Sequence, residues 1–423
     1  MARRIPASGI NLFQLIYIYI NEYLEKTGEQ PLNLSLGNPD TIPTQALREM
    51  QSRYVLDSSY QYHTYAEDKN LLGFAEAMTE LHGRIRIEEH GHLKTVPIAG
   101  IKTASAYLAL ACGLHLPNRF SRDQFRVVSN LPAYDIIGTW AENYLGAGRI
   151  VWPLRSSEGM RLNLKRLEEI LKTAASRIDL IFVIRPGNPA SVGANQQEWR
   201  DLIELCLKHN SRLVNDAAYA GLSDNTHVPL ASVAKDYPEL DWMELYSVSK
   251  SFSDPGARLG AAVGSKDFME DFILVKGNTD SGPVPGLMAA YGDFLKSGAA
   301  MTALTELRTL YRKRLDYLIP HFKAAGLKPA CATEAGFFTL WKVPKRVLGV
   351  EIAAYAQENA LAAHEAFNRL VISQTGIVGV HFQGFSEDGG AEPLIRYAVC
   401  ADVLDLTFQR RFEQALERLR PEY

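Results

Sequence analysis

The alternation of short apolar runs with longer amphipathic stretches predicts the fold of the middle of the chain. Seven short runs rich in β-branched residues predict strands at residues 95–99, 125–129, 148–152, 178–184, 212–216, 243–248 and 258–263. Between them, apolar residues recur at helical spacing, as in residues 162–175 and 196–208. Strands that alternate with helices are typical of a mostly parallel sheet flanked by helices, so we expect one large α/β domain.

The two ends of the chain have a different pattern. Long helical stretches at residues 301–325, 351–370 and 404–419 are separated by short strand-like runs at 336–342 and 394–399. Near the start, Phe13, Ile16 and Ile20 predict an amphipathic helix. We expect both ends to form a smaller α+β domain, because chain ends often pack together. The expected divisions are an N-terminal arm and helix at 1–46, the large domain at 47–299 and the small C-terminal domain at 300–423.

Composition narrows the class of protein. Of 423 residues, 47% are apolar and 22% charged, and 45 Lys and Arg residues nearly balance 48 Asp and Glu residues. This is typical of a globular protein, without the basic excess that binds nucleic acid. Asn11 and Gln14 interrupt the apolar N-terminal run, which does not read as a signal peptide, and no segment reaches membrane-spanning length. Four widely spaced cysteines are expected to be reduced in a cytoplasmic protein.

Several motifs lack the context that their chemistry needs. Residues 247–250 match the S-x-x-K of serine β-lactamases, but the companion motifs occur in the wrong order and the serine ends a predicted strand. Neither a glycine-rich dinucleotide fingerprint nor a P-loop occurs. The acidic and histidine cluster at 88–92 is interpreted as a solvated turn, because no H-E-x-x-H helix accompanies it. We therefore expect no metal.

Polar residues follow the predicted strands where a ligand of an open α/β sheet binds, beyond the carboxyl ends. They are Asn188, Asp216, Tyr219, Ser247, Lys250 and Arg258. This set supplies what pyridoxal 5'-phosphate requires. Lys250 offers an amine that condenses with the cofactor aldehyde, and Arg258 and Ser247 can bind its phosphate.

The remaining members of the set address the cofactor ring. A carboxylate at Asp216 would keep the pyridine nitrogen protonated, so that the ring accepts electrons from a bond broken at Cα. Tyr219 and Asn188 can both donate to the phenolic oxygen and lower the pKa of the lysine nitrogen bound to the cofactor. Other roles stay open: a surface lysine at Lys250, a helix cap at Asp216 and a turn residue at Asn188.

In this order, N-P, D-x-x-Y, S-x-S-K and G-x-R-x-G, the motifs resemble those of the class I/II aminotransferases, which are fold type I pyridoxal phosphate enzymes. The match extends from Gly37 to Arg396. The resemblance implies a homodimer in which Tyr62 reaches the phosphate bound by the neighbouring subunit. It also implies that backbone amides at Gly100, Ile101 and Lys102 contact the phosphate and that Tyr134 stacks on the cofactor ring. The substrate carboxylate is expected near Gly37 and Arg396. Alternatively, Tyr134 packs a loop and Arg396 pairs with Glu392 or Asp402.

Three positions depart from the family pattern. The usual N-P-T-G ends here in Ala190 and Ser191, the glycine expected after Tyr62 is Glu67, and the second aromatic of the P-x-Y-P-x-Y motif is Ile137. The chemical groups remain, but substrate choice and the course of the loops stay open.

The sequence thus predicts an aminotransferase that moves an amino group from an L-amino acid to a 2-oxo acid, with Lys250 transferring the proton. A lyase, cyclase or decarboxylase on the same site is the alternative, since fold does not fix function. A ligand-sensing regulator is disfavoured, because the length leaves no room for a DNA-binding domain. Residues 276–283 contain no arginine, and Asp280 either disfavours dicarboxylic donors, so that a neutral or basic amino acid is the best donor, or it caps a turn or faces solvent.

Overall fold

The computed structural model describes residues 12–114, 125–134, 136–223 and 227–423. They divide into two compact units. The small unit contains the described residues up to Gly37 together with Arg312–Cys331 and Phe337–Tyr423, and the large unit contains Asn38–Tyr311 and Ala332–Gly336. The helix α13, Gly298–Ala324, contributes residues to each unit.

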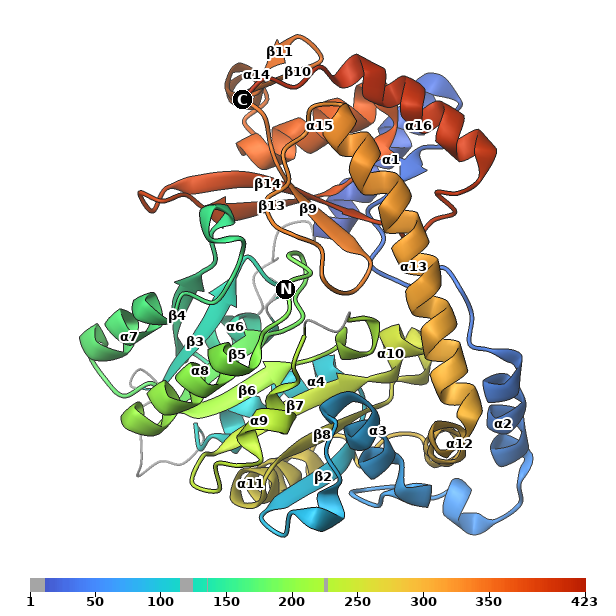
Figure 1. Ribbon diagram of the computed structural model, residues 1–423, viewed down its shortest axis with the longest axis vertical. Coiled ribbons are helices and arrows are strands. Elements are labelled where there is room, and N and C mark those ends of the chain that lie inside the picture. The colour runs from blue at the N-terminus through green and yellow to red at the C-terminus, as the bar shows by residue number, and fades with distance from the viewer. Residues whose placement is uncertain (1–11, 115–124, 135, 224–226) are drawn as a thin grey trace, which may run out of the picture. The chain divides into compact units, whose positions relative to one another are not determined.

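A seven-stranded sheet forms the centre of the large unit, in the order β2-β8-β7-β6-β5-β3-β4 (Figure 1). Its strands are β2 Leu93–Ile98, β3 Arg126–Leu131, β4 Gly148–Pro153, β5 Leu180–Ile184, β6 Arg212–Asp216, β7 Trp242–Ser247 and β8 Gly260–Ser265. Strand β8 runs antiparallel to its neighbours β2 and β7, and the other pairs are parallel. The mostly parallel sheet and its seven strands confirm the prediction, with ends that differ by at most two residues.

Helices cover both faces of this sheet. On one face lie α4 Ile101–Ala106, α6 Ile136–Gly138 and α11 Lys266–Gly277, with α5 Leu108–Ala111 against α11. On the other face lie α3 Phe74–Gly83, α7 Leu164–Thr173, α8 Gln196–His209 and α9 Leu230–Ala234. Because helices cover both faces, central strands such as β5 are buried at every position, which explains their continuous apolar runs. Outside these layers, α2 Gln45–Leu56 packs on α12 Pro285–Lys296.

The small unit is an α+β layer built from both chain ends. Its antiparallel sheet has the order β13-β14-β9, formed by Val380–Phe385, Ala391–Ala398 and Phe338–Lys342. Two short strands, β1 Leu32–Asn33 and β12 Ile377–Val378, pair in parallel, and β10 Arg346–Val347 and β11 Val350–Glu351 form a hairpin. Helix α1, Leu12–Thr27, buries Ile16 and Ile20 against Ile372, Val378 and Val380. The N-terminal helix therefore packs with the C-terminal part, as expected.

One predicted helix is wrong. Residues 351–370 form two helices, α14 Ile352–Glu358 and α15 Ala363–Thr375, instead of one. Between them Ala360 has a left-handed φ of 54°, and the N–H of Leu361 donates to Ala356 O at 2.9 Å. A left-handed residue with such a bond ends a helix. The last long helix, α16, spans Leu406–Leu419, close to its predicted bounds.

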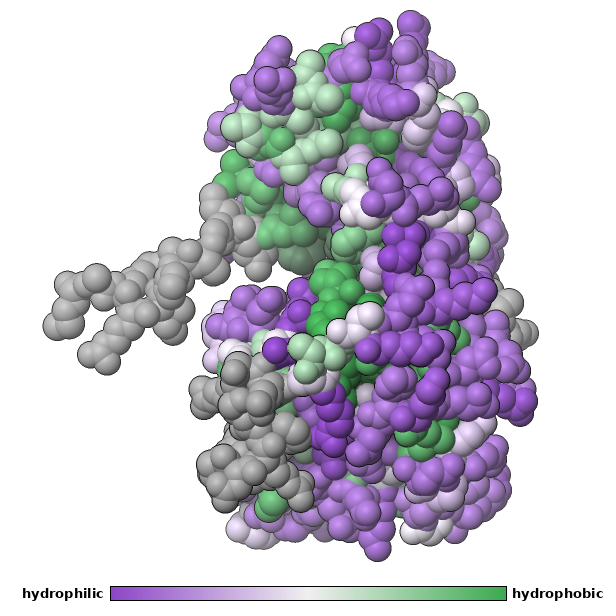
Figure 2. All heavy atoms as spheres, turned by 90° about the vertical axis from the view of Figure 1, so that its left-hand side faces the viewer, coloured by the Kyte–Doolittle hydropathy of each residue, from purple (hydrophilic) through white to green (hydrophobic). Residues whose placement is uncertain are grey.

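The surface has a mixed character. On the face drawn in Figure 2, hydrophilic side chains cover most of the area and hydrophobic ones gather in smaller groups. Within the described residues, no helix has the length and apolar character needed to cross a membrane. The described residues also contain no group of three or more His, Cys, Asp or Glu side chains arranged to hold a metal ion.

Candidate active site

The polar residues predicted to hold a cofactor meet at one edge of the large unit's sheet. Strand β7 ends at Ser247, which pairs with Gly260 of β8, and Gly260 in turn pairs with Ile98 at the end of β2. Strand β6 ends one strand further along at Asp216, which pairs with Ile184 of β5. The segments that follow these strands therefore converge, as expected for a ligand site in an open α/β sheet.

Lys250 lies in a short, capped helix. The helix α10, Val248–Ser251, begins after Ser247, whose Oγ accepts a hydrogen bond from the Ser249 N–H at 3.1 Å. This cap fixes the turn between strand and helix and leaves Lys250 half-buried at the sheet edge. The Ser247 hydroxyl oxygen is thus already committed to the turn, and only its O–H can donate to a ligand.

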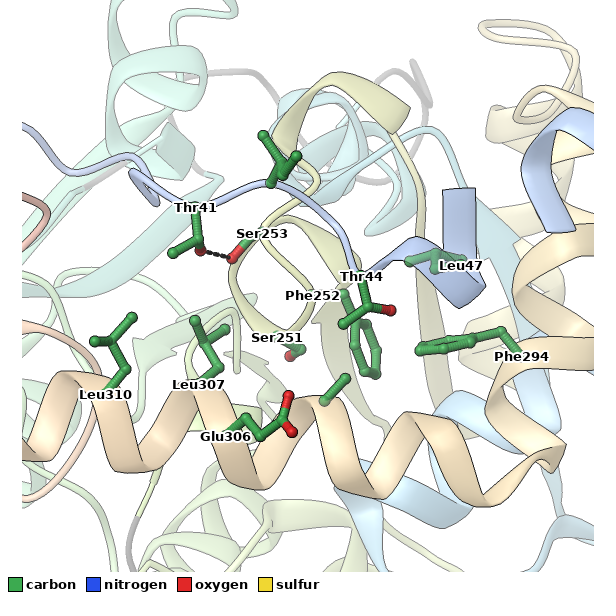
Figure 3. Close-up of a pocket in the computed structure, with 12 residues that line it drawn as sticks. Thr41, Thr44, Leu47, Ser251, Phe252, Ser253, Phe294, Glu306, Leu307 and Leu310 are labelled. Carbon is green, nitrogen blue, oxygen red and sulfur yellow. Dashed lines mark hydrogen bonds between the residues drawn. The ribbon is translucent and has the colours of Figure 1, made fainter. Parts of the chain in front are cut away.

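The loop after Lys250 is anchored by two side chains. Ser253 has a left-handed φ of 54°, and its Oγ hydrogen-bonds Thr41 Oγ1 at 2.6 Å (Figure 3). Asp254 accepts hydrogen bonds from Gln51 Nε2 at 2.7 Å and from the Tyr291 hydroxyl at 2.9 Å. These contacts hold the segment that connects Lys250 to Arg258.

Figure 3 shows a cavity beside this loop, of about 220 Å³, between the start of α2 and the helix α13. Its wall is mainly apolar and includes Leu47, Phe252, Phe294 and Leu307. None of the residues predicted to contact a cofactor lines it. The cavity is therefore separate from the predicted cofactor contacts.

Arg258 and Gly100 lie in contact. Arg258 has a left-handed φ of 50° and an exposed side chain, and Gly100 has a φ of 86°. A Cβ at Gly100 would lie 3.0 Å from Nη2 of Arg258, so any larger residue would push the guanidinium away. The backbone amides of Ile101 and Lys102 follow directly, where α4 begins. Helix α4 has six residues, so local N–H groups rather than a long helix dipole contribute to binding an anion here.

Asp216 is a buried carboxyl with spare hydrogen-bonding capacity. It is 7% exposed, and burial raises its pKa to about 6. The Ala218 N–H, which donates to Oδ1 at 2.9 Å, and the charge of Lys250 oppose that rise. Among the described residues this is the one hydrogen bond to its side chain. A protonated ring nitrogen would supply the missing cationic partner.

Asn188, Tyr219 and Tyr134 belong to adjoining loops. The Tyr134 N–H donates to Asn188 O at 2.9 Å, which joins the loops after β3 and β5. Asn188 is 9% and Tyr219 6% exposed, whereas the Tyr134 ring is 43% exposed. Buried polar donors beside an exposed aromatic ring suit a planar ligand with a polar rim.

Tyr62 lies apart from these contacts. It ends the short 3₁₀ turn Tyr60–Tyr62, and its half-buried ring packs edge-on against Tyr54 with centroids 5.0 Å apart.

Arg396 is in the small unit, buried between aromatic rings. It lies on β14 and is 1% exposed, with its guanidinium carbon 4.1 Å from the centre of the Phe338 ring and 5.9 Å from that of Phe382. Its Nη2 donates to Ser35 O at 2.6 Å, and a Cβ at Gly37 would lie 3.7 Å from Nη1. Gly37 and Arg396 therefore meet, as the family pattern implies.

The carboxylates weighed as alternative partners of Arg396 form other ion pairs. Glu392 pairs with Lys342 at 3.4 Å, and Asp402 lies 4.0 Å from Arg314.

Asp280 fits the turn interpretation. Its carboxylate accepts hydrogen bonds from Lys276 Nζ and the Tyr107 hydroxyl, both at 2.9 Å, and from the Gly282 N–H at 2.8 Å. The Lys276 side chain is 1% exposed, so this is a buried ion pair. The alternative interpretation, in which Asp280 selects the substrate, is not supported, because its charge is already balanced.

Together these groups fit pyridoxal 5'-phosphate. The large unit offers the amine of Lys250 and the guanidinium of Arg258, which Gly100 leaves space for. It also offers the buried carboxyl of Asp216, which accepts one hydrogen bond among the described residues. These are the contacts that the cofactor's aldehyde, phosphate and ring nitrogen require.

Sequence reasoning missed one segment at this site. Residues Ala332–Gly336 come from the C-terminal part of the sequence but pack in the large unit beside Ser191 and Tyr219. Gly336, the first residue of the predicted strand-like run, was the one signal that the sequence offered.

Comparison with known proteins agrees with the geometry. Residues 29–405 match the family model described as aminotransferase class I and II. The chain is 25% identical to the LL-diaminopimelate aminotransferase of Syntrophobacter fumaroxidans, covering 94% of this chain and 92% of the relative. It is 26% identical to that of Moorella thermoacetica, covering 99% and 97%. The aspartate aminotransferase structure from Rhizobium meliloti superposes with a TM-score of 0.77 at 18% identity, covering 99% of each chain, which shows the shared fold.

Proposed function

The chain belongs to the class I and II aminotransferases, and we propose that Lys250 is the amine at the centre of its reaction. It is a pyridoxal phosphate-dependent enzyme that moves an amino group from an amino acid to a 2-oxo acid. The observation that carries the assignment of Lys250 is its place in the capped helix α10 directly after Ser247, where β7 ends beside β6 and its buried Asp216.

When bound, pyridoxal 5'-phosphate supplies an aldehyde that takes up the amino group and a ring that withdraws electrons from the substrate Cα. Lys250 Nζ moves a proton between that Cα and the cofactor's C4′, acting as base and then as acid.

Other residues hold the cofactor. Asp216 keeps a proton on the ring nitrogen, while Asn188 and Tyr219 donate to the phenolic oxygen and Tyr134 stacks on the ring. The phosphate is bound by Arg258, by the Ser247 hydroxyl and by backbone N–H groups at Gly100, Ile101 and Lys102. Gly100 supports this arrangement, since a side chain there would displace the guanidinium of Arg258.

The substrate carboxylate is bound by Arg396 of β14, next to the turn that contains Gly37. Phe338 and Phe382 beside the guanidinium restrict its hydration and its rotamers. A dehydrated, fixed arginine binds a carboxylate through two parallel hydrogen bonds.

For the amino donor we propose LL-diaminopimelate, the substrate in the names of the most similar relatives reported above. A comparison of kcat/KM for LL-diaminopimelate, aspartate, glutamate, lysine and an aromatic amino acid tests this. A preference for aspartate would contradict it.

The enzyme is proposed to be a cytoplasmic homodimer. Val55, Leu56, Tyr60 and Tyr65 are 52% to 80% exposed within eleven residues of sequence, and such a group favours burial against a second copy. Tyr62 lies in this stretch and would reach the phosphate of the neighbouring subunit. Among the described residues, Cys112, Cys206, Cys331 and Cys400 form no disulfide. Light scattering that gives a monomer with full activity would refute the dimer.

The assignment of Lys250 is tested by borohydride reduction of the holoenzyme followed by peptide mass spectrometry. We expect the cofactor's mass on the peptide that contains Lys250, and none in Lys250→Ala. Attachment to another lysine would overturn the assignment. A half-reaction screen then follows the change in cofactor absorbance with each amino acid in the absence of an oxo acid.

A further inference from the structure

A five-residue segment, Ala332–Gly336, forms a strap across two loops of the large unit. Its first contact is with the loop after β5. The N–H groups of Glu334 and Ala335 both donate to Ser191 O, at 2.9 and 3.1 Å. Ser191 lies three residues after Asn188, so the strap is bound directly to the loop that carries Asn188.

The side chain of Glu334 strengthens this attachment. One carboxylate oxygen accepts a hydrogen bond from the Gly193 N–H at 2.9 Å, and the other pairs with Nη2 of Arg161. Nη1 of Arg161 donates to Gly193 O at 3.2 Å. Glu334, Arg161 and Gly193 therefore form a closed ring of hydrogen bonds, and the Glu334 side chain is 14% exposed.

The other end of the strap contacts the loop that carries Tyr219. The Gly336 N–H donates to Leu222 O at 2.9 Å, and Ala335 forms a β-bridge with Ser223. Gly336 has a left-handed φ of 67°, and a Cβ there would lie 3.3 Å from Cδ1 of Tyr219. The strap backbone thus packs on the Tyr219 ring, at a distance that only glycine permits without displacing the ring.

We propose that the strap fixes Asn188 and Tyr219 relative to each other, and that Glu334 is the positioning residue that holds it. This inference rests on the proposed roles of those two residues toward the cofactor's phenolic oxygen. Two donors to one oxygen must each lie within hydrogen-bond distance of it, and they belong to loops that follow different strands. A shared brace on both loops provides that precision.

The test uses the holoenzyme of Glu334→Gln, which keeps the size of the side chain but loses the charge that holds Arg161. The readout is the pH midpoint of the visible absorbance of the bound cofactor, which the two phenolic-oxygen donors depress. We expect the midpoint to rise by about 0.5 to 1 pH unit and kcat to fall about tenfold, with a smaller change in KM. Arg161→Lys keeps the charge but not the double contact, and should give a smaller rise.

Glu168→Gln is the matched control, because Glu168 also pairs with two cations, Lys172 and Lys208, but on the surface of the large unit. It should leave the midpoint and kcat unchanged. If Glu334→Gln lowers the urea midpoint of unfolding but leaves the absorbance midpoint in place, the strap is merely structural and the inference is overturned.

Tyr219→Phe separates this inference from the proposed function. It should raise the absorbance midpoint by itself. If it does and Glu334→Gln does not, the strap inference fails while the role of Tyr219 stands. If Tyr219→Phe leaves the midpoint unchanged, the role of Tyr219 fails and the strap inference fails with it.

Discussion

Two buried carboxyls on neighbouring strands, Asp216 on β6 and Glu244 on β7, have opposite surroundings. Burial raises the pKa of both. Glu244 accepts hydrogen bonds from Asn215 Nδ2, the Leu230 and Ala231 N–H groups and the Tyr246 hydroxyl, at 2.7 to 3.1 Å. Asp216 accepts one, from the Ala218 N–H, within the part of the chain that the structure describes.

The difference separates a carboxyl that the protein itself satisfies from one that we propose to bind a ligand. Four donors compensate Glu244 within the protein, so a ligand would add nothing there. The Asp216 carboxyl has fewer hydrogen-bond donors than Glu244 has, and it lies at the sheet edge near Lys250. A cationic ligand there would supply a further donor and a balancing charge. Burial and a raised pKa are common to both sites, and the count of satisfied hydrogen bonds is what distinguishes them.

The largest expected effect is on catalysis. Asp216→Asn removes the charge that we propose holds the ring-nitrogen proton, and we expect kcat/KM to fall by about 10²–10³-fold, by analogy with the loss of one electrostatic group elsewhere. Glu244→Gln, measured as folded holoenzyme, should keep kcat/KM within about threefold. Steady-state kinetics on both variants gives the answer, and equal losses would erase the distinction between the two carboxyls.

The next effect is on the free energy of unfolding, and here the substitution of Glu244 is expected to cost more than that of Asp216. In Glu244→Gln the amide N–H₂ faces groups that are themselves donors, so at least one buried N–H or O–H loses its acceptor. We expect a loss of about 3 kcal/mol in the free energy of unfolding, the usual size for breaking a buried hydrogen-bond network. Urea unfolding of the apoprotein measures it. A loss below about 1 kcal/mol would mean that water reaches this carboxyl.

The third prediction concerns pH. Burial raises the pKa of Asp216 from its ordinary value of 3.8 to about 6, so the folded state binds more protons than the unfolded state between pH 4 and 6. The protonated Asp216 carboxyl therefore contributes up to about 3 kcal/mol to the free energy of unfolding at low pH. This contribution is lost as the pH rises through 6.

Apo Asp216→Asn should consequently be more stable than the apo wild type above pH 7, with a gap that closes near pH 4. Unfolding of both apoproteins across this range checks the sign. A gap that is independent of pH would show that Asp216 does not titrate differently in the folded state. Adding the cofactor should reverse the order of the two proteins.

Much of the large unit could be predicted, because buried parallel strands leave long apolar runs in the sequence. The errors came where local backbone geometry overrode periodicity. The break at Ala360 contains neither Gly nor Pro, so the helical pattern continued through it. Strand β13 was not predicted, although its partner β14 was and although Val380 and Phe382 alternate with His381 and Gln383 as in a strand with one exposed face.

Only those residues of the site that belong to short sequence motifs could be predicted. Spacing alone located Lys250, Asp216 and Arg258, whose roles stay proposals. The strap was missed because Glu334 lies more than 140 residues from its partner Gly193, and no short-range pattern encodes such a contact. The charge of Asp280 is balanced by Lys276, four residues away, a spacing that the sequence did contain, whereas its hydrogen bond from Tyr107 spans 173 residues and leaves no short-range pattern.

The smallest effect extends the comparison from carboxyls to hydroxyls. Ser191 and Ser253 are both buried, at 1% and 5% exposure, and both have left-handed φ angles, of 52° and 54°. Among the described residues, Ser191 Oγ has no hydrogen-bond partner, whereas Ser253 Oγ is paired with Thr41 Oγ1. A left-handed serine costs about 1 kcal/mol relative to glycine, and an unpaired buried hydroxyl costs about 1 to 3 kcal/mol more.

Ser191→Gly removes both costs and should stabilise the apoprotein by about 1 kcal/mol, after the extra entropy of an unfolded glycine is subtracted. Ser253→Gly relieves the same strain but breaks a hydrogen bond, so it should be neutral or destabilising by about 1 kcal/mol. Ser191→Ala isolates the hydroxyl, because it keeps the strain. Urea unfolding of the three apoproteins ranks them, and a Ser191→Gly protein no more stable than Ser253→Gly would show that the Ser191 hydroxyl has a partner in solution, such as a bound water.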